Sequence, residues 1–180
     1  MVTLVLESGV QIGFRPVLPD DEPLVADAFR TASPETLLHR FFTPLREVPS
    51  SELRRLLSID PARETCIVGE LGAPVGRRIV CGARFVRLTD PSVAEIALTV
   101  HDDFQGRGVG TFLLRHLIQL GRADGIRTFV ADILATNGPM LRVLQKLVPK
   151  RRVTFAGGVC HVEFDLAEAP APIADVAGDR

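Results

Sequence analysis

The chain has 180 residues, of which 46% are hydrophobic, and a formal net charge of -1 at pH 7. This length and composition predict one domain that buries a full core without disulfides or a structural metal. The balanced charge excludes nucleic acid and anionic membranes as main partners. The three scattered cysteines indicate neither a disulfide framework nor a zinc site. No apolar run approaches the ~18 residues that span a bilayer, so we expect a soluble cytoplasmic protein without a metal site.

The first 60 residues predict two short strands followed by helices. The stretch "TLVLESGVQIGFRPV" reads as two extended pieces around a Ser-Gly turn, and the second piece ends at Pro16. Acidic residues 20–22 then open a helix that runs to about Arg30. The segments "SPETLLHRFF" and "PSSELRRLLSI" each carry serine and proline where helices start. Two or three helices therefore fill residues 20–59.

The hydrophobic period changes from Arg63 onward. The runs "ETCIVGEL", "RRIVCGARFVRL" and "VAEIALTV" predict an antiparallel meander. A helical apolar pattern then leads to the strand "IRTFVADIL", and this order predicts a parallel crossover. The segment "NGPMLRVLQKL" reads as a further helix and "RRVTFAGGVCHVEFDL" as a hairpin. Residues 1–166 thus form the predicted single domain, and residues 167–180 a tail expected to be disordered.

The stretch "QGRGVG", residues 105–110, lies between a strand that ends at Val100 and a helix that begins near Gly108. Backbone N–H groups and the positive end of a helix meet there, which predicts an anion site, and Arg107 adds a cation. A Walker loop requires Gly-Lys-Ser/Thr, which does not follow Gly110, and a dinucleotide fingerprint has the spacing GxGxxG. A tight turn without a ligand is the alternative.

The segment resembles motif A of the GNAT superfamily of N-acetyltransferases, in which a strand ending in valine is followed by Q/R-x-x-G-x-G/A and a helix. Val100, Gln105, Gly108 and Gly110 meet this pattern, and the order of elements over residues 10–166 is similar to that of the superfamily. The resemblance implies a GNAT fold of the α/β (α+β) class. Such a fold has a mixed, mostly antiparallel sheet of about seven strands, splayed between the fourth and fifth strands, and about four helices.

The resemblance also implies acetyl-CoA, or another acyl-CoA, as co-substrate. Its pyrophosphate would contact the backbone N–H groups of residues 105–110, and its pantetheine arm would pair like a strand with residues 98–100. Asn137 is similar to a family asparagine that contacts the cofactor at a helix start, although a helix cap explains it too. The implied cofactor-binding residues are Leu98, Thr99, Val100, Gln105, Gly106, Arg107, Gly108, Val109, Gly110, Thr111 and Asn137.

Glu95 is the candidate catalytic residue. A lysine with a pKa of about 10.4 is neutral in only about one part in 2,500 at pH 7, so its attack benefits from a general base. Glu95 precedes Gln105 by ten residues in "AEIALTV", an offset that resembles the base position of lysine acetyltransferases in this superfamily. Strand alternation puts Ala97 and Thr99 on the same face, and an outward-facing structural carboxylate is the alternative.

The general acid of the family has no counterpart here. Family members often carry a tyrosine about seven residues after the asparagine, where this chain has Val143 and Leu144, and the chain contains no tyrosine. The thiolate either leaves unaided, which a thiol pKa of ~8.5 makes tolerable, or takes its proton from another donor, with His101 the nearest candidate in sequence. No cysteine lies beside a plausible base, so we expect direct attack without a covalent enzyme intermediate.

The segments "RPVLPDDEPLV", "SPETLLHRFF" and "AEIALTVHDDFQGRGVGTFLLRHL" resemble the acetyltransferase domain of bacterial protein lysine acetyltransferases of the Pat kind. This resemblance implies a protein lysine as acceptor, for example on an acyl-CoA synthetase. We expect Asp102, Asp103 and Glu95 to form an acidic rim that suits such a lysine. A small-molecule amine acetyltransferase and a non-catalytic acyl-CoA-binding or sensing module are the alternatives.

Overall fold

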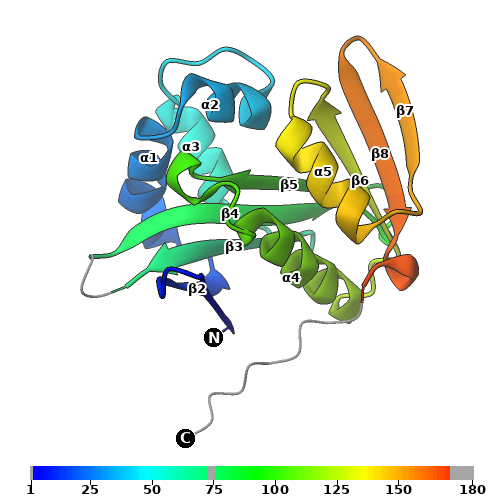
Figure 1. The fold of residues 1–180 in the computed structure, drawn as a ribbon, viewed down its shortest axis with the longest axis horizontal. Helices are drawn as coiled ribbons and strands as arrows, with labels where there is room; N and C mark the ends of the chain where they lie inside the picture. The colour runs from blue at the N-terminus through cyan, green and yellow to red at the C-terminus, as the bar shows by residue number, and fades with distance from the viewer. Residues whose placement is uncertain (1, 73–75, 171–180) are drawn as a thin grey trace, which may run out of the picture.

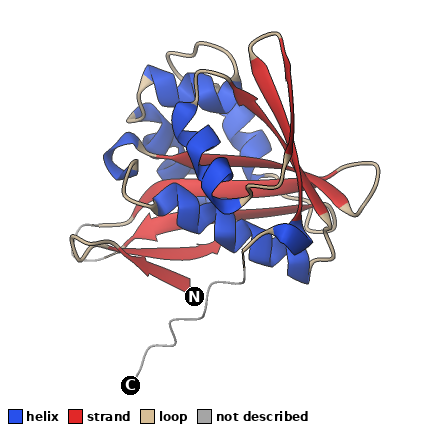
Figure 2. Ribbon diagram, turned by 45° about the vertical axis from the view of Figure 1, so that its right-hand side comes forward, coloured by secondary structure: helices blue, strands red, loops and turns tan. Residues whose placement is uncertain are grey.

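The computed structural model describes residues 2–72 and 76–170, which form one mixed β-sheet with helices on both faces (Figures 1 and 2). The described sheet has eight strands in the order β1-β2-β3-β4-β5-β6-β8-β7. All neighbouring strands are antiparallel except β5 and β6, which are parallel. The strands are β1 (Val2–Val5), β2 (Gln11–Pro16), β3 (Glu64–Leu71), β4 (Arg78–Arg87), β5 (Val93–Val100), β6 (Thr128–Leu134), β7 (Arg152–Ala156) and β8 (Val159–Asp165).

The helices of the described residues largely follow the predicted start signals. The Ser33 side chain accepts a hydrogen bond from the N–H of Thr36 and caps the second helix, as the sequence predicts. The arrangement is the predicted one, with one strand and one α-helix more than the approximate counts. The α-helices are α1 (Glu22–Arg30), α2 (Pro34–Phe41), α3 (Ser50–Leu57), α4 (Val109–Ala123) and α5 (Gly138–Leu147), and the 3-10 helices are η1 (Pro19–Asp21), η2 (Asp102–Phe104) and η3 (Leu166–Glu168).

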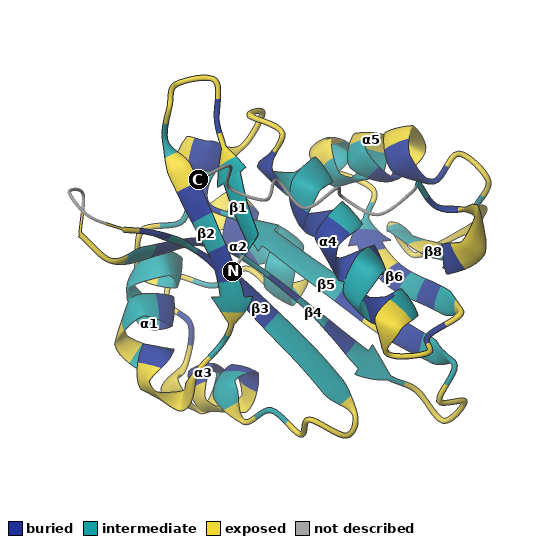
Figure 3. Cartoon of the chain, turned by 90° about the horizontal axis from the view of Figure 1, so that it is seen from below, coloured by how far each residue is buried: buried dark blue, intermediate teal, exposed yellow. Residues whose placement is uncertain are grey.

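The two faces of the sheet bury separate apolar clusters. Ile67 and Val68 are neighbours on β3, yet Ile67 packs in the cluster that contains α4 and Val68 in the cluster that contains α1, α2 and α3. Successive strand residues point to opposite faces, so α4 covers one face and α1–α3 cover the other (Figure 3). The sheet is therefore a central layer between two sets of helices.

The sheet divides between β5 and β6. Parallel pairing joins Val93–Glu95 to Thr128–Val130 and stops there in the described sheet. The remaining residues of β5, 96–100, still pair with β4, whereas β6 continues with β8. Figure 1 shows β6, β8 and β7 turning away from the strands on the other side of this junction. These two strands correspond to the fourth and fifth strands of the predicted fold, so the predicted splay is present.

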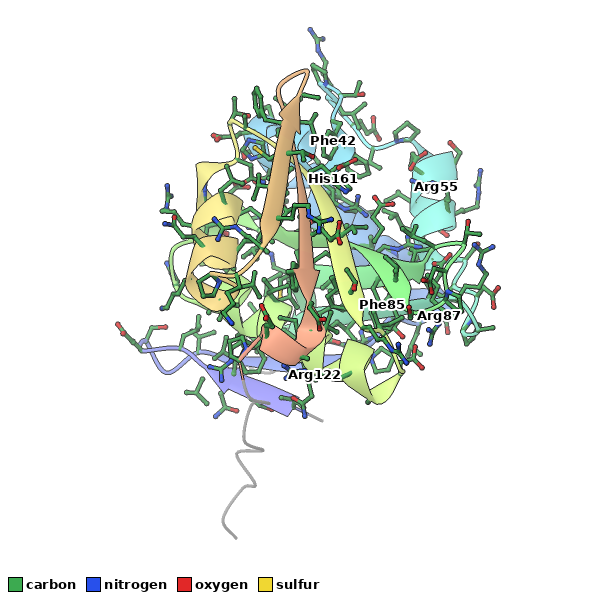
Figure 4. All side chains as sticks on the ribbon, turned by 90° about the vertical axis from the view of Figure 1, so that its right-hand side faces the viewer. Phe42, Arg55, Phe85, Arg87, Arg122 and His161 are labelled. Atoms are coloured by element: carbon green, nitrogen blue, oxygen red, sulfur yellow. The ribbon has the colours of Figure 1, made fainter. Side chains whose placement is uncertain are left out.

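The first residues of the predicted tail pack against the domain. Arg122 of α4 donates hydrogen bonds to the carbonyl oxygens of Leu166, Ala169 and Pro170, and Ala169 is buried. Figure 4 shows Arg122 next to the 3-10 helix η3. The domain therefore extends to at least Pro170, four residues beyond the predicted boundary. The rest of the predicted tail, 171–180, lies outside the described residues.

Candidate active site

A cleft of about 430 Å³ lies beside the free end of β5, between α2 on one side and α5 with the start of α4 on the other. Figure 1 shows α2 and α5 on either side of this end of the sheet. Most of the predicted cofactor-binding residues come together here, although they lie on three separate elements. Those that line the cleft are Leu98, Thr99, Val100, Gln105, Gly106, Gly108, Gly110, Thr111 and Asn137.

Two glycines shape the turn that precedes α4. Gly106 and Gly108 have φ angles of 71° and 83°, in the left-handed region that favours glycine. Gly108 caps α4 and accepts the N–H of Phe112 at 3.0 Å, so the N–H groups of residues 109–111 have no acceptor within the helix. A Cβ atom at Gly106 or Gly108 would meet no described protein atom within 4 Å. The turn thus presents free donors and a positive helix end to open space, which fits a pyrophosphate.

Two of the predicted residues do not line the cleft. Arg107 is exposed, and its Cζ atom lies 5.8 Å from the ring centroid of Phe104. Its side chain lies over Phe104 and does not line the cleft, so the predicted contact of Arg107 with the cofactor stays a prediction. The side chain of Val109 is completely buried in the core, so only its backbone N–H can contribute to the site.

The cations of the cleft come from residues that the sequence analysis did not connect with it. Arg142 and Lys146 lie on one face of α5 with Pro139 and Val143, and Arg40 approaches from α2. The intervals of three and four residues on α5 are those of a single helix face. This spacing was a usable signal in the sequence, whereas nothing local relates Arg40 to the glycine turn.

The edge of β5 offers backbone groups to a ligand. The N–H of His101 donates to the carbonyl of Val80 on β4 at 2.8 Å. Backbone groups alternate in direction along a strand, so those of Leu98 and Val100 point away from β4 and into the gap toward β6. The amide nitrogen of Gln105 donates to the carbonyl of Val100 at 3.0 Å, which joins the glycine turn to this edge.

Glu95 faces the side of the sheet that α1–α3 cover. Its neighbours Ala94 and Ile96 are buried in the cluster around α4, so alternation directs Glu95 to the opposite face with Ala97 and Thr99, as predicted. The Glu95 side chain is exposed, and it lines neither the cleft nor the cavity described next. A carboxylate at this place is open to water and to an incoming molecule.

A second cavity of about 90 Å³, which we call the inner cavity, lies between α1–α3 and the sheet. Its walls are mostly apolar and include Val25, Val68 and Ala97. Three residues line both the cleft and the inner cavity, and we call this set the neck: Thr36, Arg40 and Thr99. The two spaces therefore meet at Thr99, one of the β5 residues predicted to contact the pantetheine arm.

Asp102 holds α2 in place instead of forming an acidic rim. Its carboxylate accepts hydrogen bonds from the N–H of Ser33 at 2.8 Å, the Ser33 hydroxyl at 2.6 Å and the Thr36 hydroxyl at 2.9 Å. Burial opposes the charge, but these hydrogen bonds together outweigh it and lower the pKa of Asp102. Asp103 pairs with Arg78 at 3.3 Å. The predicted acidic rim is wrong, because protein groups already bind both carboxylates.

Asn137 and His39 mark the far side of the cleft. The Asn137 side chain accepts the N–H of Met140 at 3.1 Å, so the helix-cap explanation is confirmed, and Asn137 also lines the cleft. His39 of α2 lines the cleft, and its Nε2 atom lies 3.3 Å from the Thr136 hydroxyl. No sequence motif surrounds His39, so its place in the cleft became visible only in the folded chain.

The structure places no acid at the position of the family tyrosine. Val143 lines the cleft and Leu144 is completely buried, and neither side chain can donate a proton. His101 is buried, lines the inner cavity, and has its Nε2 atom 3.1 Å from the hydroxyl of Thr31. His101 therefore lies on the side of the neck that faces the inner cavity and not in the cleft.

The cysteines of the chain are free thiols. Burial raises the pKa of Cys81 to about 12 and also raises the pKa of Cys66, so neither forms a nucleophilic thiolate readily. Across residues 2–72 and 76–170, no three His, Cys, Asp or Glu side chains gather as ligands of one metal ion would. No helix in the same residues has the length and apolar character to cross a membrane.

A splayed sheet with a glycine turn and a helix start beside its free strand edge defines a class of enzymes, the acetyltransferases that bind acyl-CoA. The profile of the acetyltransferase (GNAT) family matches residues 31–147 of the chain. The chain therefore belongs to the acetyltransferase (GNAT) family.

Known proteins support this membership. The chain is 35% identical over 143 residues to acetyltransferase Pat of Mycolicibacterium smegmatis, an alignment that covers 79% of this chain and 42% of that protein. The crystal structure of the GNAT domain of S. lividans PAT superposes with a TM-score of 0.80 at 27% identity, over 91% of this chain and 95% of that domain. YncA of Salmonella typhimurium, solved with its cofactor acetyl-CoA, has a TM-score of 0.66 at 20% identity, over 91% and 98%, and shows the shared fold. The chain thus spans less than half of the Mycolicibacterium relative.

Proposed function

We propose that residues 2–170 form one N-acetyltransferase domain that moves acetyl from acetyl-CoA to a primary amine. The observation that carries this proposal is the free edge of β5 next to the glycine turn: backbone groups of Leu98 and Val100 and the N–H groups of residues 109–111 open into one cleft. CoA fits this arrangement, because its extended arm can pair with the strand edge while its pyrophosphate binds the N–H groups at the helix start. Arg142 and Lys146 add positive charge along the same cleft.

The residues at β5 are suited to bring an amine to the acyl carbon. When bound, acetyl-CoA supplies a thioester carbonyl that the amine attacks. Thr99 joins the cleft to the inner cavity, so the face of β5 that carries Thr99 and Glu95 is where we propose that the amine approaches the acyl group. Glu95 lies on the same face of β5 as Thr99, at the last residue of β5 that pairs with β6, and we assign it as a general base that removes the amine proton through water. Its exposure supports such a relay.

The departing thiolate needs no protein acid in this proposal. Val143 and Leu144 offer no proton at the place where relatives often carry tyrosine. Because a thiol has a pKa of ~8.5, its thiolate is a tolerable leaving group near neutral pH. Water in the open cleft can protonate it after release.

We propose a protein lysine as the acceptor, for example on an acyl-CoA synthetase. The similarity to acetyltransferase Pat supports this assignment, and so does the exposure of Glu95, which a side chain on a protein surface can approach. The acidic residues 102 and 103 no longer support it, since both are engaged within the protein. Family membership favours an enzyme over the non-catalytic alternative.

The acceptor is tested by incubating the chain with isotopically labelled acetyl-CoA and, in parallel, a purified acyl-CoA synthetase or a panel of polyamines and aminoglycosides. Mass spectrometry should find labelled acetyl-lysine on the synthetase, above the level seen without the chain, and poor turnover of the small amines. Efficient labelling of a small amine with no labelled protein would reject the lysine assignment and retain the cofactor assignment.

A further inference from the structure

Arg40 is a cation without a described counter-charge at the centre of the substrate-binding region. It lines both the cleft and the inner cavity. Its guanidinium carbon lies 5.3 Å from the ring centroid of Phe41, and no carboxylate in residues 2–72 and 76–170 lies within ion-pair distance of it. Arg40 is half-buried and has no ion-pair partner among the described residues, so an anion bound at the neck would supply one.

The groups around Arg40 leave a net demand for negative charge. Burial lowers the pKa of Arg40, as do the guanidinium groups of Arg84 and Arg55, whereas the Cys66 thiol and the Glu52 carboxylate act in the opposite direction. Arg84 lines the same inner cavity and is already paired with Glu64, while its Nε atom is buried without a hydrogen-bond partner. The neck therefore attracts an anion.

Thr99 supplies a second polar group at the same place. Its hydroxyl makes no hydrogen bond to the described part of the chain, whereas the third neck residue, Thr36, donates to Asp102 and accepts from Gln105 at 3.0 Å. Thr36 is thus occupied, and Arg40 with Thr99 offers a charged donor and a hydroxyl donor to one group. An arginine and a hydroxyl together match the oxygens of a carboxylate.

The space available limits the size of the bound group. The inner cavity of about 90 Å³ is small, and its walls are mostly apolar, with Arg84 and His101 as polar residues beyond the neck. A carboxylate with a short apolar stem fits both the volume and the chemistry.

We propose that the neck is a carboxylate-binding subsite, in which Arg40 and Thr99 bind a carboxylate of one of the two substrates. This inference rests on the proposed acyl transfer in the same cleft. The carboxylate comes either from the acyl group, as in a dicarboxylic acyl-CoA, or from the acceptor, as in an acidic residue beside the target lysine.

The acyl source is tested with two thioether analogues that bind without reacting, carboxyethyl-CoA and carbamoylethyl-CoA, which differ only in charge at the end of the stem. If the acyl group carries the carboxylate, calorimetry should show the wild type binding carboxyethyl-CoA about 10- to 100-fold more tightly. Arg40→Met should abolish this ratio, Arg40→Lys should keep part of it, and Thr99→Val should reduce it.

The acceptor source is tested by kcat/KM with acetyl-CoA for two lysine peptides that are identical except for glutamate or glutamine beside the lysine. If the acceptor carries the carboxylate, the glutamate peptide should be favoured by a similar factor, and Arg40→Met should remove the preference. The matched control is Arg142→Met, which removes a cation that lines the cleft but not the inner cavity. It should weaken both members of a pair equally.

An Arg40-dependent preference in either pair supports the subsite and identifies its source. The proposal is overturned if neither pair shows a carboxylate preference, if the preference survives Arg40→Met, or if Arg142→Met removes it. Equal losses of kcat with charged and neutral substrates would also overturn it, because Arg40 would then serve the reaction itself. Binding of unmodified CoA distinguishes failure of the proposed function from failure of the subsite. If the chain does not bind CoA, the proposed function is contradicted. If it binds CoA but shows no preference for a carboxylate, only the subsite is contradicted.

Discussion

A substitution at Gly108 tests whether the pyrophosphate of CoA binds at the glycine turn. Gly108→Asp places a carboxylate at the turn where the pyrophosphate is proposed to bind. Two like charges about 4 Å apart repel by about 1 to 4 kcal/mol in solvent-exposed surroundings, so CoA affinity should fall between about 5-fold and several hundredfold. Isothermal titration calorimetry with CoA measures this change.

Gly108→Asn is the control for this experiment. Both substitutions meet the same positive φ of 83°, so they share the backbone strain and differ in charge. The asparagine variant should keep most of the affinity. Equal affinity of the two folded variants for CoA would show that no phosphate lies at the turn.

A substitution at Glu95 tests its proposed role as the general base. If Glu95 is the general base, Glu95→Gln should lower kcat by ~10² to 10⁴ with little change in CoA affinity. The deficit should shrink as the pH approaches the pKa of the acceptor amine, because a larger fraction of the amine is then neutral. A pH profile of kcat/KM measures this, with Glu7→Gln, an exposed change in the turn between β1 and β2, as control. A rate near that of the wild type at neutral pH would favour direct attack without a protein base.

At the scale of elements, the Asp102 carboxylate joins the start of α2 to the loop after β5. Asp102→Ala removes the acceptor of three hydrogen bonds and should destabilise the domain by about 1 to 3 kcal/mol. The pKa of Asp102 is lowered in the folded chain. Its contribution is therefore complete above the unfolded-state pKa of about 3.9 and is lost as the pH falls through the lower folded-state value.

Urea denaturation of both proteins measures this contribution. The difference in unfolding free energy between wild type and Asp102→Ala should be similar at pH 6 and 7 and smaller at pH 3. Asp103→Ala, which removes an exposed carboxylate that contacts Arg78 and His101, should cost about 1 kcal/mol or less. A difference for Asp102→Ala that stays constant down to pH 3 would mean that the charged carboxylate is not what holds α2.

The separation of interacting elements along the chain explains which parts of the site the sequence predicts. The glycine turn is predictable because helix start, strand end and glycine spacing are local properties of residues 100–110. Asp102 was misjudged because its partners Ser33 and Thr36 are 69 and 66 positions away. The position of the Arg107 side chain over Phe104 could not be predicted, because an adjacent position in sequence does not fix the direction of a long side chain.

For the whole molecule, the splay between β5 and β6 is the feature on which the function depends. Order of elements and a family resemblance were enough to predict it. The neck could not be predicted, since it forms only where α2 meets β5, and Arg40 and Thr99 share no local pattern. The packing of α2 against β5 leaves the cleft on one side of Thr99 and the inner cavity on the other.

The splay makes a prediction about the sheet as a whole: CoA should complete it. Because His101 donates its N–H to β4, alternation gives the amides of Ala97 and Thr99 partners on β4 and leaves those of Leu98 and Val100 facing the gap. If the pantetheine arm pairs with this edge, hydrogen exchange at Leu98 and Val100 should slow on saturation with CoA.

Residue-resolved exchange followed by NMR measures this effect, with Ala97 and Thr99 as internal references that should be protected in both states. Gly108→Asp, titrated with the same concentration of CoA, should show less protection at Leu98 and Val100 because it binds less ligand. Unchanged exchange at both amides in a wild-type sample saturated with CoA would mean that the ligand does not pair with β5. The cleft would then bind CoA through the glycine turn and the cations of α5 alone.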